Sequence, residues 1–455
     1  METDMNIKEI EIQSLFGYFD HKIPLKEDDR ITIIHGPNGV GKTTILRLVS
    51  DLFNRQFLSL FVTPFDRIVI RFNPKGSLTV VRTKEAKPKE SDSVKLELIY
   101  RLGQERTKHT VSSLTMQEVL REYPSRLLES MIDNIERVGP YEWYDEKTDR
   151  KMSLIEVILS YGDLLPSDIR GSVIPIPPKI ESILEQTHIV FVETQRLFTR
   201  HKEEDEELVP RYRRKVPVQQ RITVEQYSED MVTQINEYQR KSGELGASLD
   251  SSFPRRLLEL KLPEIATKEH IGKEYNSQSE YRARLMEAGL IVAETSIPIH
   301  PEGLEDNERK LLWAYLDDVK KKLQIFDWLL PRVELFKDVV NSRFSYKKFE
   351  VDREKGFIFE SEHDGSIVPP RALSSGEQHE IVLTYELLFK APAGSLIFID
   401  EPELSLHLTW QMRFLEDITR IANLADLDFL VATHSPSIIH NRRDLMVKLA
   451  GKEED

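Results

Sequence analysis

The feature that most constrains this chain is the segment from His35 to Thr44, which contains a complete G-x-x-x-x-G-K-[ST] pattern. It follows the apolar run Ile31 to Ile34 and leads into a second apolar segment that begins at Ile45. A strand, a glycine-rich loop and a helix in this order form a phosphate site, where backbone N–H groups and the helix dipole attract anions. The pattern therefore predicts an α/β fold that binds a nucleotide.

The residues of this loop have separate expected roles. We expect Lys42 to contact the β- and γ-phosphates and Thr43 to hold Mg²⁺. The residues expected to bind the phosphates are Gly36, Pro37, Asn38, Gly39, Gly41, Lys42, Thr43 and Thr44.

A second strand pattern, Leu396 to Ile399, ends in the two carboxylates Asp400 and Glu401. Apolar parallel strands bring their last residues to the carboxyl edge of the sheet, where doubly wound folds bind ligands. We expect Asp400 to hold Mg²⁺ through water. Glu401 is expected to orient and deprotonate the attacking water.

Two short segments flank these carboxylates. Leu373-Ser-Ser-Gly-Glu-Gln378 precedes them and Ala432-Thr-His-Ser435 follows them. Each segment is weak evidence when taken singly, but their order along the chain is informative.

In this order the motifs resemble those of the ABC-type ATPases, in the branch that contains the SMC, Rad50, RecF and OLD proteins. The resemblance covers residues 1–60, the region around residue 195, and residues 345–445. It implies an α/β fold with an ABC-type P-loop ATPase core, made of a RecA-like lobe and an antiparallel β subdomain. It also implies ATP and Mg²⁺ as cofactors and ATP hydrolysis as the activity.

In this family the signature segment of one subunit closes on the nucleotide held by another. The resemblance therefore implies that Ser374 and Gly376 cap a γ-phosphate in trans. Ser375 replaces the first glycine of the usual motif, and Glu377 stands at the usual glutamine position. All four residues, Ser374, Ser375, Gly376 and Glu377, are thus expected to bind the nucleotide.

Two further residues match catalytic positions of the family. His434 matches the switch histidine, which contacts the γ-phosphate. Gln195 matches the Q-loop glutamine, a catalytic residue and a ligand of Mg²⁺. For Gln195 a purely structural role remains an alternative, because a lone glutamine after an apolar strand is common.

The form Asp-Glu-Pro-Glu-x-x-Leu-His, from Asp400 to His407, resembles the OLD-like ATPases of bacterial anti-phage systems. Size and motif content look most like the AriA family of ATPase subunits from PARIS defence systems. That resemblance implies a homo-oligomer of ATP-sandwich dimers, up to a hexamer, and a separate Toprim effector nuclease like AriB. It also implies an acidic phage trigger such as the DNA mimic Ocr, and it leaves DNA binding open.

Three alternatives remain. A Septu-type defence ATPase with an HNH nuclease would share these motifs, and so would a RecF-like or Rad50-like DNA repair ATPase. A scaffold that does not hydrolyse ATP is less compatible with the intact Lys42 and Glu401. We expect no nuclease activity in the chain itself, because the segment after His434 lacks a recognisable Toprim carboxylate pattern.

Composition narrows the class of protein. The chain has 455 residues, 40% of them hydrophobic, which indicates a globular protein of two or three packed units. It has no cysteine, which excludes disulfides and the zinc hook of a Rad50-like protein. The acidic start and the lack of a long apolar run predict a cytoplasmic protein. A net charge of −14 restricts any nucleic-acid contact to local basic sites.

The chain pattern predicts two core lobes separated by insertions. The expected units are an N-terminal lobe at 1–111, a helical insertion at 112–188, a core strand at 189–200, a helical or coiled-coil insertion at 201–344, and a C-terminal lobe at 345–455. The first lobe should contain antiparallel strands near residues 66–72, 77–82 and 94–101. A hairpin is expected from strands at 349–351 and 357–359, turning at Lys355-Gly356.

Three further patterns carry weaker hypotheses. Phe16, Tyr18 and Phe19 are candidates for stacking on adenine, although aromatic residues beside a strand more often join the core. The block from Arg211 to Arg221 is basic and lies beside an acidic run, so it is either a solvated loop or a contact for an acidic partner. Apolar residues from Leu312 to Leu330 follow a heptad spacing, which predicts coiled-coil-like packing in a short helical hairpin or bundle. After Pro331 we expect the helix to kink or restart.

Overall fold

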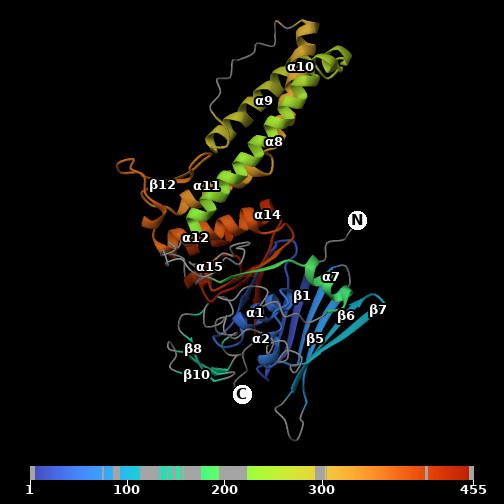
Figure 1. Ribbon diagram of the computed structural model, residues 1–455, viewed down its shortest axis with the longest axis vertical. Helices are drawn as coiled ribbons and strands as arrows, with labels where there is room; N and C mark the ends of the chain where they lie inside the picture. Colours follow the sequence, from blue (N-terminus) through green and yellow to red (C-terminus); the bar gives the residue numbers. More distant parts are fainter. Residues whose placement is uncertain are drawn as a thin grey trace, which may run out of the picture. The chain divides into compact units, whose positions relative to one another are not determined.

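The computed structural model describes residues 6–73, 76–85, 93–112, 132, 135–139, 142–145, 150–153, 157, 176–193, 223–292, 303, 305–404 and 408–449. The chain divides into two compact units (Figure 1). The first consists of residues 1–212 and 391–455, and the second of residues 213–390. The expected boundary at residue 345 is therefore wrong, because residues 345–390 pack with the helical insertion.

A five-stranded parallel sheet forms the centre of the first unit. Its strands, in spatial order, are β11 (Ile189–Glu193), β14 (Leu396–Asp400), β15 (Asp428–Ala432), β3 (Ile31–His35) and β16 (Met446–Lys448). β3, β14 and β15 are almost wholly buried, as expected of apolar strands covered on both faces. Three separate parts of the chain supply this sheet, namely β3, β11 and the group from β14 to β16, and the carboxyl ends of the strands share one edge.

A six-stranded antiparallel sheet packs beside it in the same unit. Its order is β2 (Phe19–Pro24), β1 (Asn6–Leu15), β4 (Arg67–Asn73), β5 (Gly76–Glu85), β6 (Ser93–Leu102) and β7 (Glu105–Ser112). One hydrophobic core joins the buried face of this sheet to helix α1 (Lys42–Phe53) and to the parallel sheet. Short helices α2 (Leu58–Val62) and α7 (Pro178–Gln186) contribute to that core. The predicted antiparallel subdomain is thus present.

Three described segments between residues 135 and 153 are strands, whereas the sequence pattern predicted a helical insertion. Strands β8 (Ile135–Gly139), β9 (Glu142–Asp145) and β10 (Arg150–Ser153) form a small antiparallel sheet. Trp143 is fully buried in it, and the guanidinium of Arg137 lies 5.9 Å from the centre of the indole ring. Burying one large aromatic side chain stabilises strands that are otherwise short and polar.

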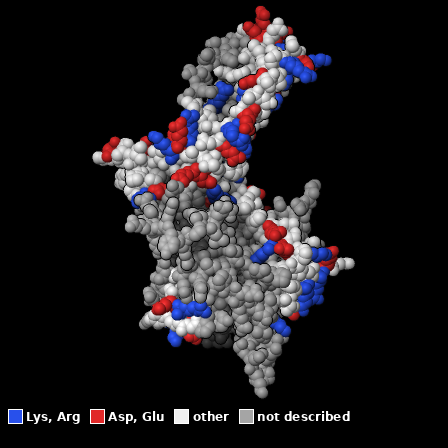
Figure 2. Space-filling model, in the orientation of Figure 1, with Lys and Arg blue, Asp and Glu red and all other residues white. Residues whose placement is uncertain are grey.

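The second unit is built on long helices: α8 (Thr223–Glu259), α9 (Lys268–Glu287) and α10 (Asp306–Gln324). Figure 1 shows α8 and α10 side by side in an elongated bundle. Arg256 on α8 donates two hydrogen bonds, of 2.7 and 2.6 Å, to the buried carboxylate of Asp318 on α10. Figure 2 shows Lys and Arg interspersed with Asp and Glu along these helices, as expected of a solvated bundle.

The base of the second unit is an aromatic cluster. It joins helix α11 (Leu329–Arg343), the hairpin β12 (Lys347–Asp352) and β13 (Gly356–Ser361), helix α12 (Ser375–Tyr385) and the π-helical turn Glu386–Lys390. The ring of Phe336 lies within 6 Å of four other aromatic rings, those of Phe349, Phe357, Tyr385 and Phe389. α11 restarts at Leu329, so Pro331 lies in its first turn, where proline is tolerated. Of the two outcomes expected near Pro331, a kink or a restart, the structure shows a restart, which lies at Leu329, two residues before Pro331.

The remaining helices follow the two carboxylates of β14. They are α13 (Leu408–Gln411), α14 (Phe414–Ala425) and α15 (Pro436–Ile439). Within the ranges given above, no helix combines the length and the apolar character needed to cross a membrane.

Candidate functional site

The phosphate loop joins β3 to α1 at the carboxyl edge of the parallel sheet. Gly41 is the N-cap of α1 and has φ +92°, a left-handed conformation that glycine adopts without strain. A Cβ atom at Gly41 would also lie 2.4 Å from Leu15, so a side chain has no room there. At Gly36 a Cβ atom would lie 2.8 Å from the carbonyl oxygen of Leu449. Close packing on both sides therefore fixes the loop.

Lys42 is folded into the loop that precedes it. Its Nζ donates to the carbonyl oxygens of Gly36 and Pro37, both at 3.0 Å, and the residue is only 5% exposed. Burial lowers the pKa of Lys42, and the carboxylates of Glu401 and Asp400 oppose that shift. The ammonium group thus stands in a desolvated loop with weak, neutral partners that phosphate oxygens can replace.

Asp400 ends β14, two strands away from the phosphate loop in the sheet order. Its carboxylate accepts a hydrogen bond from the hydroxyl of Thr43, the residue that follows Lys42. Burial raises the pKa of Asp400, while Thr43 and Lys42 act in the opposite direction. A hydroxyl and a carboxylate both offer hard oxygen atoms, which Mg²⁺ prefers as ligands. In nucleotide sites Mg²⁺ is usually bound by one or two carboxylates together with the substrate phosphates, and this pair of side chains fits that pattern. Thr43 and Asp400, which were each expected to hold Mg²⁺, thus lie within hydrogen-bond distance of each other.

Glu401 follows Asp400 in an unusual backbone conformation. Its φ is +46°, and its backbone N–H donates to the carbonyl oxygen of Ala432 at 2.8 Å. Non-glycine residues in this region are uncommon and concentrate at functional sites. The turn places Glu401 at the carboxyl edge of the sheet, where its charge acts on both Lys42 and His434.

His434 follows β15 at the same edge. Its ring centre lies 6.3 Å from that of His35, the last residue of β3. Burial lowers the pKa of His434, and the positive charge of Lys42 lowers it further, against the opposing carboxylates of Glu401 and Glu403. A neutral imidazole near a lysine and two carboxylates can donate a hydrogen bond to a phosphate oxygen. Lys42, Asp400, Glu401 and His434 therefore converge as the sequence predicts.

The signature segment lies in the second unit, at the start of α12. Ser374 is the N-cap residue: its hydroxyl accepts from the N–H of Glu377 at 3.3 Å, and the carboxylate of Glu377 accepts from the N–H of Ser374 at 2.7 Å. Ser374 and Ser375 are exposed. A capped helix N-terminus with exposed hydroxyl groups is suited to an anion.

The three aromatic candidates separate by exposure. The side chains of Phe16 and Phe19 pack against the hydrophobic core of the first unit. Tyr18 is 58% exposed and lies between them in the β1–β2 turn. His21 on β2 is buried and its Nε2 lies 2.9 Å from the carbonyl oxygen of Val40, so this hairpin supports the phosphate loop. Of the three, Tyr18 is the ring accessible to a base.

Some sequence predictions fall outside the described residues. Gln195, His407 and the basic block at 211–221 are among them. The strand expected before Gln195 is present as β11, and its last residue, Glu193, pairs with Asp400 at the carboxyl edge.

Sequence reasoning assigned no role to two residues that fix functional segments, one in each unit. Glu403 binds both the hydroxyl of Thr433 and the backbone N–H of His434, each at 2.8 Å. Lys347 binds the carboxylate of Glu377. The motif Asp-Glu-Pro-Glu already contained Glu403, but its partners lie thirty residues further along the chain. No local sequence pattern indicated the role of Lys347, because its partner Glu377 lies thirty residues further along the chain.

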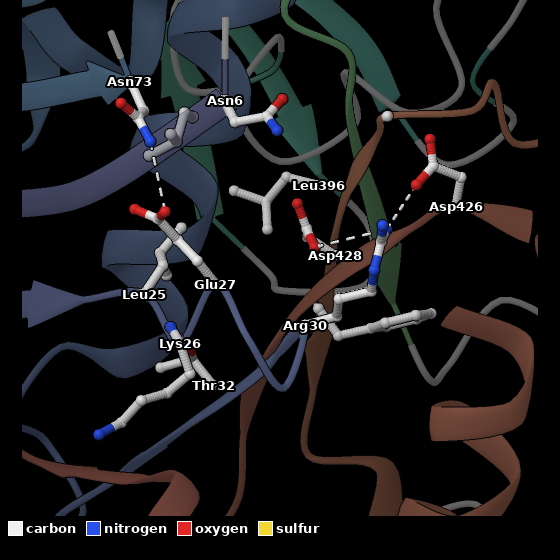
Figure 3. A pocket seen from close by; sticks show the side chains of 13 residues that line it. Asn6, Leu25, Lys26, Glu27, Arg30, Thr32, Asn73, Leu396, Asp426 and Asp428 are labelled. Atoms are coloured by element: carbon white, nitrogen blue, oxygen red, sulfur yellow. Dashed lines mark hydrogen bonds and ion pairs between the residues drawn. The ribbon is translucent and has the colours of Figure 1, made fainter. Parts of the chain in front are cut away.

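A pocket of about 140 Å³ lies at the opposite, amino edge of the parallel sheet (Figure 3). Figure 3 shows Arg30 directed at Asp426 and Asp428, at 2.6 and 4.0 Å. Asn73 donates to Glu27 at 3.3 Å on the other side. These ion pairs and hydrogen bonds close the start of β3, so we assign the pocket a structural role.

Several solved structures match the chain at low sequence identity. The SMC head bound to the C-winged helix domain of ScpA has 11% identity and a TM-score of 0.30, with 96% of this chain and 91% of that chain covered. The SMC head domain from Thermotoga maritima has 10% identity and a TM-score of 0.31, with 98% and 94% covered. The Smc head domain from Pyrococcus yayanosii has 11% sequence identity and a TM-score of 0.29, with 96% of this chain and 93% of that chain covered.

A search of curated proteins found no match. Residues 198–440 match the protein family described as "AAA domain, putative AbiEii toxin, Type IV TA system". The match covers more than half of the chain and includes the signature segment, Asp400, Glu401 and His434, whereas the phosphate loop precedes it. The chain therefore belongs to this AAA domain family.

Proposed function

We propose that this protein binds ATP with Mg²⁺ and hydrolyses it to ADP and phosphate. The observation that carries this proposal is the convergence of Lys42, Asp400, Glu401 and His434 at one edge of the parallel sheet. These four residues come from three separate parts of the chain. A phosphate loop, two carboxylates and a histidine at one site match the requirements of phosphoryl transfer to water.

Each side chain has a role that follows from its position. Lys42 exchanges the carbonyl oxygens of Gly36 and Pro37 for phosphate oxygens, which neutralises negative charge. Glu401 accepts a proton from the attacking water, and His434 donates a hydrogen bond to the γ-phosphate. Thr43 and Asp400 would hold Mg²⁺, which supplies positive charge to the β- and γ-phosphates when bound.

Two substitutions test these roles. Lys42→Ala should weaken nucleotide binding, because Lys42 contacts phosphates in the ground state. Glu401→Gln should leave binding intact and reduce kcat, because Glu401 acts on the water. Glu416→Gln, an exposed carboxylate on α14, is the matched control and should behave as wild type. Phosphate release and binding of a fluorescent ATP analogue measure the two effects separately. Full turnover by Glu401→Gln would refute the assignment.

We further propose that the ATPase is a sensor subunit of a bacterial anti-phage system, as in the AriA subunits of PARIS systems. In this proposal it forms ATP-sandwich dimers, up to a hexamer, and holds a separate Toprim nuclease like AriB until an acidic phage protein such as Ocr triggers release. Two observations support it. The matched family is described by a toxin and a TA system, and the helical unit adds a large surface outside the ATPase core.

The neighbouring gene provides the test. Tagged protein should co-purify with the product of its neighbouring gene and, when purified alone with Mg²⁺ and ATP, should leave plasmid DNA and transfer RNA intact. ATP turnover should rise with the trigger protein. Turnover that rises with DNA alone, without a co-purified partner, would favour a DNA repair ATPase and overturn the defence role. Cleavage by the isolated chain that a clean Glu401→Gln variant loses would overturn the switch role.

A further inference from the structure

We propose that Glu403 is a positioning residue that fixes His434 at the phosphate site. This inference rests on the proposed ATPase function. Glu403 lies in the short 3-10 turn Pro402–Leu404 that follows the two carboxylates of β14. It contacts neither Lys42 nor the phosphate loop by any hydrogen bond among the described residues. Its carboxylate instead reaches the turn that carries His434.

Both oxygens of this carboxylate are used on that turn. Oε1 accepts the backbone N–H of His434 and Oε2 accepts the hydroxyl of Thr433, each at 2.8 Å. A carboxylate that accepts two neighbouring donors fixes both their distance and their orientation. The backbone of His434 is thereby held at a set distance from Glu401, two residues before Glu403.

The backbone N–H, the carbonyl oxygen and the hydroxyl of Thr433 all have polar partners. It is fully buried, and its N–H donates to the carbonyl oxygen of Ile34 at 3.3 Å. Its own carbonyl oxygen lies 3.4 Å from Nδ1 of His35, and its hydroxyl accepts the N–H of Ser435 at 2.9 Å. The turn is therefore attached to β3 on one side and to Glu403 on the other.

A second connection runs through Gln411 on α13. The side-chain amide of Gln411 donates to the carbonyl oxygen of Glu403 at 3.3 Å and accepts from the hydroxyl of Ser435 at 2.8 Å. Glu403 and the His434 turn thus have two independent links. Together they join the segment after β14, which carries Glu401, to the histidine after β15.

A third negative charge beside Asp400 and Glu401 opposes the binding of phosphate. A neutral amide would avoid that charge but could accept only one of the two hydrogen bonds, because its nitrogen is a donor. Two hydrogen bonds offset this cost. The bonds from the backbone N–H of His434 and from the hydroxyl of Thr433 are both stronger when the acceptor is an ionised carboxylate. The arrangement favours precise placement of His434 over a lower charge at the site.

The test is a double-mutant cycle between Glu403 and His434 in the full chain, measured as kcat and KM for ATP. Glu403→Ala should lower kcat by roughly 10- to 100-fold with little change in KM, since small misplacement of a catalytic group has effects of this size. His434→Ala should lower kcat to a similar degree. The double variant should show no further loss, because both changes remove the same contribution.

Further variants separate positioning from folding. Glu403→Gln keeps one acceptor oxygen at the same length, but its amide nitrogen cannot accept the second hydrogen bond, so this variant should recover only part of the lost kcat. Thr433→Val removes one of the two donors and should lose part of it. Glu416→Ala serves as the matched control on α14. Melting temperatures and ATP-analogue binding report whether each variant folds.

The outcomes are distinguishable from failure of the ATPase proposal. If wild type hydrolyses ATP and His434→Ala impairs it while Glu403→Ala does not, only the role of Glu403 is refuted. Losses that multiply in the double variant would also refute it, because Glu403 would then act independently of His434. If wild type shows no turnover in the presence of its trigger, the proposed function itself fails.

Discussion

Lys347 on β12 donates two hydrogen bonds, of 2.7 and 2.8 Å, to the carboxylate of Glu377 at the start of α12. The Glu377 side chain is 10% exposed, and the same carboxylate caps the backbone N–H of Ser374. Burial alone would raise the pKa of Glu377, but the hydrogen bonds from Lys347 and Ser374 hold it below its ordinary value. Lys347 therefore keeps the signature turn in its capped form.

Lys347→Met should loosen that turn. It leaves a buried carboxylate without its cation, which costs about 1–3 kcal/mol in folding free energy. We expect lower ATP turnover with nearly unchanged nucleotide binding, since Lys42 is untouched. Lys348→Met is the matched control, because the neighbouring Lys348 pairs with Glu350 and is 60% exposed. Equal turnover in both variants, measured by phosphate release, would contradict this prediction.

The resemblance to ABC-type ATPases predicts a composite site between two subunits. Lys42→Ala and Ser374→Arg should each abolish hydrolysis alone, through the phosphate loop and through the signature turn. Mixing the two variants should restore part of the activity, because one site in a mixed dimer then carries neither change. Phosphate release across mixing ratios measures this. A specific rate that is independent of protein concentration, from a monomer, would exclude a composite site.

The basic block from Arg211 to Arg221 is predicted to bind an acidic partner, either DNA or a protein that imitates it. Replacing Arg211, Arg213 and Arg214 by Glu should abolish triggering and spare basal turnover. Contacts between exposed charges weaken steeply with salt, because counterions screen them. Titrating the trigger at several salt concentrations tests both points. If triggering is unchanged in the charge-reversed variant, the alternative interpretation of the block as a solvated loop holds.

The burial of His379 on α12 leads to a prediction about how the free energy of unfolding depends on pH. It is 5% exposed, and its Nε2 has no hydrogen-bond partner among the described residues. Burial lowers its pKa below the ordinary value of 6.5. The unfolded chain therefore binds this proton at a higher pH than the folded chain. Stability should be full above about pH 6.5 and should fall as pH drops towards the folded pKa.

His379→Leu should remove this contribution. Its melting temperature should exceed that of wild type by several degrees at about pH 5.5 and by less at about pH 7.5. A residual slope should remain, because burial also lowers the pKa of His21 in the first unit. Parallel curves for variant and wild type, measured by differential scanning fluorimetry, would show that His379 does not titrate in this range.

Contiguous patterns were predictable from the sequence. The phosphate loop, β14 with its two carboxylates, and the hairpin that turns at Gly356 each depend on neighbouring residues, and each is present as predicted. Their signals are local because strand and helix periodicity repeats within a few residues. The approach of Lys42, Asp400 and His434 was inferred from the family resemblance and from the shared edge of parallel strands.

Elements with polar surfaces were missed. β7 (Glu105–Ser112) is an edge strand, and edge strands often carry charged residues that hide their pattern. In α9 the buried positions Ile271, Gln278 and Leu285 are seven residues apart, but the central one is polar. Gln278 is buried because its amide donates to the carbonyl oxygen of Leu316 at 2.9 Å on α10. Such a contact depends on a partner helix and leaves no trace in the local sequence.

The ion pair between Arg256 and Asp318 also has a mechanical consequence. Because it is bidentate and partly buried, α8 and α10 cannot slide along each other without breaking both hydrogen bonds. α8 has 37 residues, which corresponds to a length of about 55 Å. The two helices therefore move as one rigid arm. Near the start of α8 this arm contacts α12 and the π-helical turn, because Tyr385 donates to Asp230 and Tyr227 donates to Glu386. A tilt of roughly 5° at that end displaces the far end by about 5 Å over this length.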